Sequence, residues 1–321
     1  MPTAPAFPSA PRPKAAAVIE LEGRRRWDAG AGAAHAAAAP PKDILVLVDD
    51  MPSRIERIEI ACRLARRFGA HLTALYPLGV PDLPPTAAEM PGFDPAGAAD
   101  ELYEDERAVA AGIGRLFEEM ALHEHVSAEW RAEPGNAVAI ATRAALHNNL
   151  AVLGQPDPDF TPLMAPQVRP EDIILAAGRP ALVVPHSGHF ATVGERVLIA
   201  WQPTREAARA VNDALPLLRG AAEVRIVMVD APPPPAGAAV PAAEIAIHLA
   251  RHGIDTTVEC AVSGSRGGGG GGATILTRAA EHGSDLVVMG AYARARAQQI
   301  VLGDVTRGML RHMTVPVFMS Y

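Results

Sequence analysis

The sequence predicts an α/β protein made of two Rossmann-like units in tandem, each with a five-stranded parallel sheet. Three observations favour this fold class. Short runs rich in Val, Ile and Leu alternate with amphipathic helical patterns, the order of these elements occurs twice, and 321 residues suffice for two domains. Strands that alternate with helices favour parallel pairing through right-handed crossovers.

The first copy of the pattern begins after residue 42. We expect its strands at residues 43–49, 71–78, 126–131, 150–154 and 180–185. We expect its helices at 52–69, 98–122, 136–147 and 170–178, with the Pro-rich stretch 81–97 as a loop. The first helix carries Ile55, Ile58 and Leu64 at helical spacing and ends at Gly69.

The second copy repeats the same order. Its expected strands are 196–201, 224–230, 256–262, 285–290 and 315–320, and its expected helices are 205–218, 242–252, 273–282 and 303–312. The letters repeat too, since TRAALHNNLAVLG at 142–154 is similar to TRAAEHGSDLVVMG at 277–290. An open parallel sheet leaves an exposed edge, so we expect the two terminal strands to meet and form an internal pseudo-dimer.

Composition sets the domain limits. Residues 1–41 are rich in Ala and Pro and are expected to be a disordered extension outside the fold. The first domain is then 42–186, the linker 187–194 and the second domain 195–321. A hydrophobic fraction of 49% is enough for two packed cores.

Charge and cysteine usage point to a cytoplasmic protein. A net charge of −7 gives no basic face for nucleic acid or a membrane surface. No apolar stretch has the length of a membrane span, and none resembles a signal peptide. Cys62 and Cys260 lie far apart without a CxxC motif, so we expect reduced core thiols.

In a doubly wound sheet, ligands bind beyond the carboxyl ends of the strands. The loop after the fourth strand of the second half runs from Gly290 to Asp304, within VVMGAY and VLGDVTRGML. It resembles the nucleotide loop G-x2-G-x9-G-[S/T] of the universal stress protein family, with Gly290 and Gly303 at the first and last glycine positions. The resemblance covers about residues 43–321 in tandem form. It implies an adenine nucleotide alpha-hydrolase-like fold and an ATP site.

Residues at this edge are candidates to hold the nucleotide. The resemblance implies a site formed by Gln202, Thr204, Val229, Gly290, Ala293, Arg294, Gly303 and Asp304. Glycines let a backbone approach phosphates, and a helix start offers free N–H groups. Ala293 departs from the middle glycine, and Asp304 departs from the Ser/Thr.

These two departures predict weak ATP binding. Asp304 is expected to cap the last helix of the motif and to repel a triphosphate. Arg294 is the expected charge partner, with Arg296 beside it. Gln202 stands where the family usually has an acidic residue or Asn, and Val229 would offer backbone groups to the base by resemblance alone.

The first half departs further from the motif. It keeps Asp49 at the end of its first strand, but Gln155-Pro156-Asp157-Pro158-Asp159 follows Gly154. The two prolines remove N–H donors, and the two aspartates repel phosphate. We therefore expect a structural first half.

Other motifs predict less. The glycine run 267–272 could cradle a phosphate, but a flexible low-complexity loop is the favoured interpretation because no Lys-Ser/Thr follows. The pairs His248/His252 and His186/His189 lack a convincing third ligand, so no metal is expected. No nucleophile–base motif is visible, so we expect no enzyme activity.

The sequence thus predicts a stress-response module with possible weak ATP binding, an unknown protein partner and a possible homo-oligomeric state. Two alternatives stay open. Gly290 and Gly303 favour a slow ATP-hydrolysing switch, whereas Ala293 and Asp304 favour a structural or protein-interaction module without a nucleotide.

Overall fold

The computed structural model describes residues 18–19, 39–79, 94–160, 168–231, 242–263, 270–291, 293–296 and 299–321. The first half consists of β2 (Asp43–Leu47), α1 (Arg54–Phe68), β3 (His71–Leu78), α2 (Pro95–His123), β4 (Ala128–Pro134), α3 (Ala137–Leu146), β5 (Leu150–Gly154), α4 (Pro170–Ala177) and β6 (Ala181–Val184). The expected α/β alternation is confirmed, with element ends shifted by a few residues. The shifts reach three residues at the end of β4 and at the start of α2, which begins at Pro95 behind the capping carboxylate of Asp94.

The second half repeats this order. It consists of β7 (Arg196–Ala200), α5 (Arg205–Leu218), β8 (Glu223–Val229), α6 (Ala243–Arg251), β9 (Thr257–Ala261), α7 (Gly270–Glu281), β10 (Leu286–Gly290), α8 (Asp304–His312) and β13 (Val317–Ser320). Among the described helices, none is both long and apolar enough to cross a membrane.

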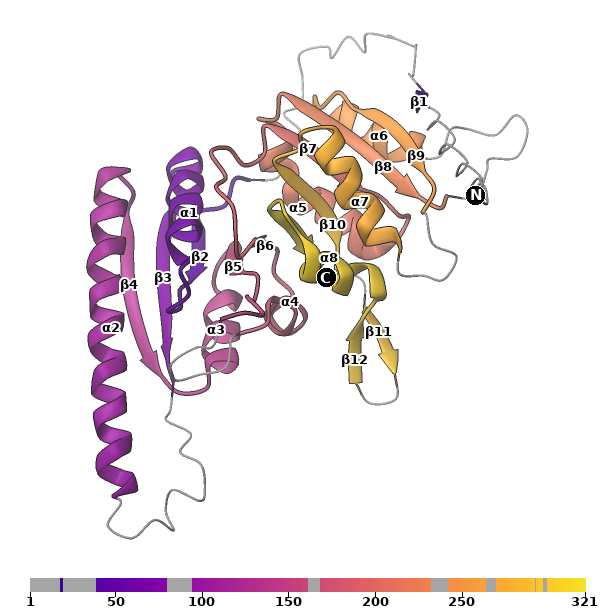
Figure 1. The fold of residues 1–321 in the computed structure, drawn as a ribbon. Helices are drawn as coiled ribbons and strands as arrows, with labels where there is room; N and C mark the ends of the chain where they lie inside the picture. Colours follow the sequence, from indigo (N-terminus) through magenta and orange to yellow (C-terminus); the bar gives the residue numbers. More distant parts are fainter. Residues whose placement is uncertain are drawn as a thin grey trace, which may run out of the picture.

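One sheet runs through both halves, as Figure 1 shows. The strand order β4-β3-β2-β5-β6 of the first half is matched by β9-β8-β7-β10-β13 in the second. All pairs within these five-stranded sets are parallel, whereas β6 and β13 pair antiparallel. The predicted meeting of the two terminal strands is therefore confirmed. Because the two sets run in opposite directions, their carboxyl ends lie on opposite edges of the sheet.

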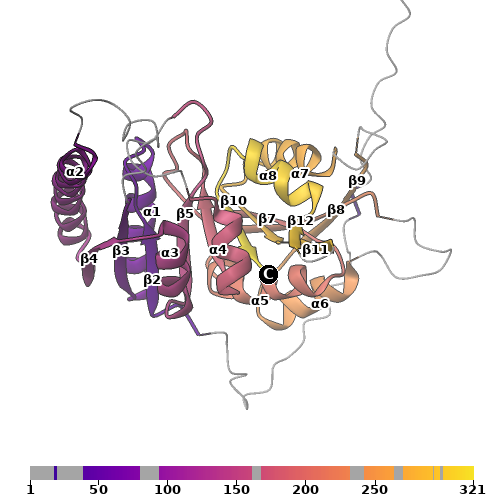
Figure 2. The ribbon, with the colours of Figure 1, turned by 90° about the horizontal axis from the view of Figure 1, so that it is seen from below.

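Helices cover both faces of this sheet. One apolar cluster contains residues of α1, α2, α5 and α6, including Ile58, Phe117 and Ile245. The other contains residues of α3, α4, α7 and α8, including Ile173 and Met309. Alternate residues of each strand join opposite clusters, as period-2 strands require. Figure 2 shows α5 and α6 on the opposite side of the second half from α7 and α8.

The repeated segments 142–154 and 277–290 make the same kind of side-chain hydrogen bond in the two halves. Asn149, just before β5, accepts hydrogen bonds from the backbone N–H groups of Lys42 and Asp43 through its side chain. Asp285, just before β10, accepts the same kind of bond from the N–H groups at 194–196, where β7 begins. Each side chain fixes the start of the central strand of its half.

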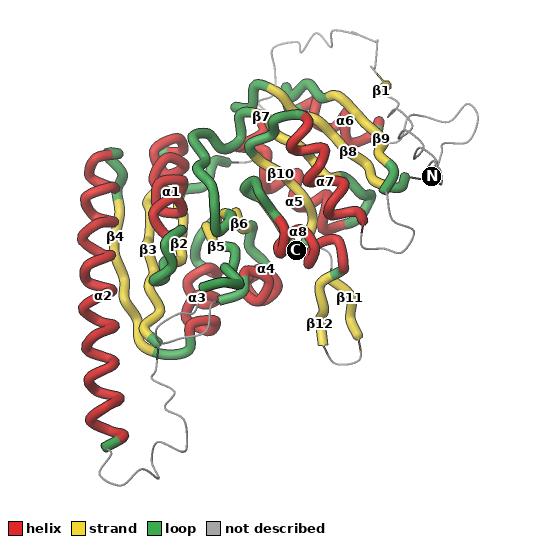
Figure 3. The backbone as a smooth tube through the Cα atoms, viewed as in Figure 1, coloured by secondary structure: helices red, strands yellow, loops and turns green. Residues whose placement is uncertain are grey.

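Three segments differ from the sequence-based expectation. Residues 293–296 and 299–302, expected to lie in a loop, form the paired strands β11 (Ala293–Arg296) and β12 (Gln299–Leu302), a hairpin that projects from the second half (Figure 3). The helix α7 already begins at Gly270, inside the glycine run, because Gly272 lets it approach the backbone of α8 closely. A Cβ on Gly272 would lie 3.2 Å from the Val305 carbonyl oxygen. Residues 267–269 lie outside the described part.

The third difference concerns the N-terminal extension. Val18–Ile19 forms the two-residue strand β1, which pairs antiparallel with β9 at Glu259 and Val258. At these two residues the chain adds to the sheet, contrary to the expectation that residues 1–41 stay outside the fold. Apart from residues 39–41, the rest of that stretch lies outside the described part.

Candidate functional site

The carboxyl edge of the second half gathers three of the predicted residues on neighbouring strands. Gln202 follows β7, Val229 ends β8 and Gly290 ends β10. β7 lies between β8 and β10, and Ala200 pairs with Met289. The chain leaves the β7–β10 boundary in opposite directions, which is the switch point where doubly wound sheets bind ligands. Gln202 is exposed there.

Thr204 serves the helix that follows β7. It is the N-cap residue of α5, and its hydroxyl oxygen accepts the backbone N–H of Ala207 at 3.2 Å. A threonine cap of this kind stabilises a helix by about 1 kcal/mol. The structure thus gives Thr204 a local role at the place where the sequence suggests a ligand contact.

Gly290 has a packing reason to lack a side chain. A Cβ there would lie 2.5 Å from the Ala207 nitrogen and 2.6 Å from the Glu206 carbonyl carbon. In the first half, a Cβ on Gly154 would lie 2.6 Å from the guanidinium carbon of Arg57. At the end of the fourth strand, each glycine therefore makes room for the first helix of its half. Close packing against α5 is thus a second reason for glycine at position 290, besides the approach of a phosphate that the sequence suggests.

Glu206 is a buried acid that the sequence analysis missed. It is 5% exposed, and the Nε of Arg205 donates to its carboxylate at 2.6 Å. Burial alone raises the pKa of Glu206, but hydrogen bonds from Arg205 and the backbone outweigh burial and hold the pKa below its usual value. A negative charge therefore lies next to Gly290. A run of Thr-Arg-Glu at a helix start is the only sequence signal that marks it.

The middle of the motif is folded into the β11–β12 hairpin. Ala293 pairs with Leu302, and Arg294 pairs with Val301. The backbone here takes part in a strand ladder instead of forming an open loop. The side chain of Arg294 lies outside the described part, so its expected role as a charge partner stays a prediction. Gly290 and Gly303 flank the base of this hairpin.

The start of α8 differs from the expectation. Gly303, with φ −64° and ψ 157°, is the N-cap residue, and α8 has no side-chain cap. Asp304 is the first helical residue, 72% of its side chain is exposed, and its carboxylate accepts from Arg307 at 2.8 Å. The prediction that Asp304 caps this helix is therefore wrong. Its carboxylate binds Arg307 of the same helix, so the first N–H groups of α8 have no side-chain cap.

The corresponding edge of the first half is filled by its own side chains. Arg57, on α1, is 1% exposed and reaches the carboxylate of Asp49 at the end of β2. It also donates to the Leu47 carbonyl oxygen at 2.7 Å. Its guanidinium lies against Gly154, between the ends of β2 and β5. A buried arginine thus occupies the switch point of this half.

Gln155 binds the opposite half. Its backbone N–H donates to the Val184 carbonyl, as that of Ala291 does to Ser320, so the two residues hold equivalent positions. The side-chain amide of Gln155 donates to the Leu310 and Arg311 carbonyls at the end of α8, at 2.9 and 3.0 Å. The first half uses its altered loop to hold a helix of the second half.

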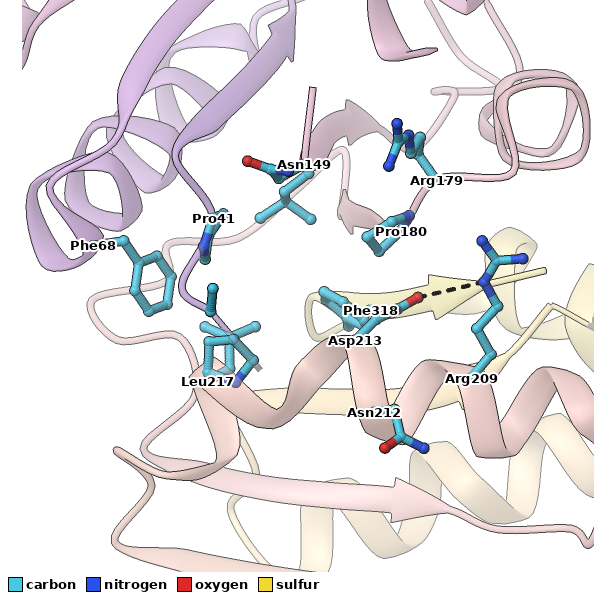
Figure 4. Close-up of a pocket in the computed structure, with 13 residues that line it drawn as sticks. Pro41, Phe68, Asn149, Arg179, Pro180, Arg209, Asn212, Asp213, Leu217 and Phe318 are labelled. Atoms are coloured by element: carbon cyan, nitrogen blue, oxygen red, sulfur yellow. Dashed lines mark ion pairs between the residues drawn. The ribbon is translucent and has the colours of Figure 1, made fainter. Parts of the chain in front are cut away.

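A cavity of about 230 Å³ lies at the seam between the halves (Figure 4). Phe68, Leu150 and Phe318 give it apolar walls. Its charged groups are engaged, because Asp213 accepts from Ser320 and faces Arg209, whose guanidinium reaches the Gly178 and Tyr321 carbonyls. These contacts join α5 to the end of α4 and to the end of β13, and explain the cavity as part of the seam.

One histidine lies beside two acids. The ligand atoms of Glu56, Glu59 and His189 lie within 4.8 Å of one another, the one such group found in the described part of the chain. Glu56 already accepts from the His189 ring and from the Phe190 N–H, and Arg63 lies 3.6 Å away. These contacts fasten the linker to α1, so we assign the group to an ion-pair network. His248 and His252 contact each other edge to face.

Comparison with known proteins agrees with this architecture. Residues 194–320 match the model of the universal stress protein family. A universal stress protein from Archaeoglobus fulgidus aligns over 88% of this chain and 97% of its own, with 17% identity and a TM-score of 0.65. One from Pseudomonas aeruginosa UCBPP-PA14, described as putative, aligns over 88% and 94%, with 15% identity and a TM-score of 0.53. A universal stress protein in complex with cAMP aligns over 46% and 99%, with 16% identity and a TM-score of 0.32. No curated protein matched.

The strand order and the helices on both faces of the sheet define a doubly wound α/β protein. The second half, residues 194–320, belongs to the universal stress protein family. The first half has the same five-stranded order, and solved structures covering 88% of the chain share the fold of both halves.

Proposed function

We propose that the chain is a stress-response module that binds one adenine nucleotide weakly, at the carboxyl edge of its second half, without catalysing a reaction. The observation that carries this proposal is the start of α8, which has no side-chain cap and follows the β7–β10 switch point through the hairpin. Free N–H groups and the positive end of a helix dipole favour phosphate. Gln202 and Val229, at the neighbouring strand ends, would face the nucleoside.

Two features support weak affinity. Glu206 and Asp304 place carboxylates at the two helix starts of this edge, and each is only locally balanced, by Arg205 and Arg307 respectively. The hairpin also engages backbone groups that an open loop would offer to phosphates. Thr204 caps α5 and Gly290 packs against it, so these two residues of the proposed site have structural roles. Such roles fit binding without catalysis.

The proposal allows one nucleotide per chain. In the first half, Arg57 and Asp49 fill the switch point, and Gln155 is committed to α8. We further propose a reducing, cytoplasmic location, in keeping with the two free cysteines, Cys62 and Cys260.

Native mass spectrometry of freshly purified protein tests the proposal directly. We expect a partially occupied species carrying one adenine nucleotide, and calorimetric titration with ATP, AMP and cAMP should then give one site per chain. If neither measurement detects a nucleotide, the protein-interaction alternative replaces the proposal. If binding is accompanied by steady release of inorganic phosphate, the slow ATP-hydrolysing switch replaces it.

A further inference from the structure

The two terminal helices of the halves end differently. α4 ends in Gly178, which has a left-handed φ of 58° and whose N–H returns to the Ile174 carbonyl. α8 passes directly into extended backbone at Met313, with φ −61° and ψ 138°. The last carbonyls of a helix need partners, which α4 supplies with a glycine cap of its own. In α8 the corresponding partner comes from the other half of the molecule.

That partner is Gln155. The residue is 2% exposed, and its amide nitrogen donates to two successive carbonyls of the last turn, those of Leu310 and Arg311. Its amide oxygen is held in turn by the backbone N–H of His186, at 3.1 Å. All three contacts of the side chain thus come from α8 and from His186, which follows β6. Removing one partner of such a buried set leaves the others unsatisfied.

The other end of α8 is the start that the proposed nucleotide site uses. α8 has nine residues and spans about 13 Å. Thr306 and Met309, inside it, are 1% and 0% exposed, so one face of the helix is packed against the rest of the protein. Gln155 of the first half therefore holds the last turn of α8, while the first turn of the same helix faces the proposed ligand site of the second half.

We infer that the first half of the chain regulates phosphate binding at the start of α8 in the second half. Gln155 is the positioning residue, and it acts through α8. The ligand in this inference rests on the proposed function, whereas the coupling of the two halves through Gln155 and α8 does not depend on it. When Gln155 holds the last turn, the N–H groups of the first turn are preorganised for a phosphate. When the contact is lost, the helix loosens and nucleotide affinity falls. Linkage is reciprocal, so bound nucleotide tightens the contact of Gln155 with α8.

Hydrogen exchange of the full chain tests the coupling without any nucleotide. Gln155→Met keeps the length of the side chain and removes its hydrogen bonds. We expect protection to fall about tenfold along all of α8, including the Arg307 and Gly308 amides in its first turns, a change of ~1.4 kcal/mol. Gln155→Asn, a milder change, should give a smaller loss with the same pattern. A loss confined to the last turn, or no loss, would overturn the inference.

The matched control is the opposite contact across the seam. Arg209→Met removes the donor that reaches Gly178 at the end of α4. Because α4 has its own glycine cap, this variant should leave the protection of α8 unchanged. If it loosens α8 as much as Gln155→Met does, the effect is general destabilisation of the seam and the inference fails.

ATP titration supplies the second readout. Gln155→Met should weaken ATP binding by about three- to tenfold, or ~1 kcal/mol, while ATP should slow exchange of the His186 amide in the unmodified protein. If ATP binds both proteins equally, the regulation is refuted. If ATP binds neither, the proposed function fails, and the exchange pattern alone decides whether the halves are coupled through α8.

Discussion

The guanidinium of Arg57 meets the carboxylate of Asp49 through two hydrogen bonds, of 2.9 and 3.0 Å. The arginine side chain is 1% exposed and that of the aspartate 36%. The pair joins α1 to the end of β2 and occupies the switch point of the first half. An internal cation thus lies where a doubly wound unit otherwise receives its ligand.

Replacing Arg57 tests the structural weight of this pair. Arg57→Met should lower the free energy of unfolding by about 2–4 kcal/mol, because the Leu47 carbonyl and the Asp49 carboxylate lose their donor at a largely buried place. Urea denaturation followed by circular dichroism measures the change. Arg143→Met, which removes an exposed partner of Glu133, should cost less than about 1 kcal/mol. Equal losses in the two variants would mean that Arg57 has no special role.

The seam between the halves depends on apolar pairs in the middle of the sheet. Val183 and Val317 are register partners on β6 and β13, and both are 0% exposed. Changing either to Ala should cost about 2 kcal/mol, since each leaves a cavity. The double variant should show a coupling of at least about 0.5 kcal/mol in denaturant unfolding. Val262→Ala, at an 83% exposed position, is the control and should be neutral. Strict additivity would argue against a direct contact across the seam.

Glu106 should make stability depend on pH. It is 4% exposed, one carboxylate oxygen accepts the Gly79 N–H, and the other has no partner among the described residues. Burial and the charge of Asp50 raise the pKa of Glu106, with the Gly79 bond opposing them. The folded protein therefore keeps this proton to higher pH than the unfolded chain does. The stabilising effect is complete below the unfolded pKa and is lost as pH rises through the folded pKa.

Glu106→Gln removes this titration. Relative to the variant, the unmodified protein should lose stability as pH rises from about 4 towards neutrality, because only its carboxyl group must ionise in a buried place. Thermal unfolding across that range measures the difference. Glu104→Gln, at an exposed position on the same helix, should show no such trend. A constant difference between Glu106→Gln and the unmodified protein would contradict the raised pKa.

Asp304 should oppose phosphate by charge alone. Asp304→Asn keeps the shape and removes the charge at the start of α8, so ATP should bind about tenfold more tightly, a gain of ~1.4 kcal/mol. Calorimetry measures the affinity. The control is Asp172→Asn, in the first turn of the equivalent helix α4, where the acid pairs with Arg169 as Asp304 does with Arg307. Equal effects, or none, would place the nucleotide elsewhere.

The structure changes one variant that the sequence alone suggests. Ala293→Gly restores the glycine of the family motif, yet Ala293 is the first residue of β11 and pairs with Leu302. Glycine weakens strands, so this change should loosen the hairpin instead of simply opening space for a phosphate. We therefore expect Asp304→Asn alone to bind ATP at least as tightly as the double variant with Ala293→Gly.

The sequence by itself determined the fold class, nearly all elements and the pairing of the two halves. Period-2 strands, 3.6-residue helices and capping signals are local, so β3 and β5 matched their predicted bounds and Gly69 ends α1 in the left-handed conformation. The repeat of 142–154 at 277–290 sufficed to indicate two copies. In each copy the equivalent side chain, Asn149 or Asp285, accepts backbone N–H groups at the start of the central strand.

Only the tertiary structure decided the roles within the site. Arg57 follows the end of β2 by several residues and reads as a polar position on an amphipathic helix, yet it is buried because Asp49 and the Leu47 carbonyl compensate its charge. Gln155 reads as a loop residue, and its partners lie 155 and 156 residues away. Gly290 fits a phosphate motif by spacing, but its neighbour in space is the backbone of α5. Such contacts depend on where separate elements meet, and no local pattern of residues encodes that.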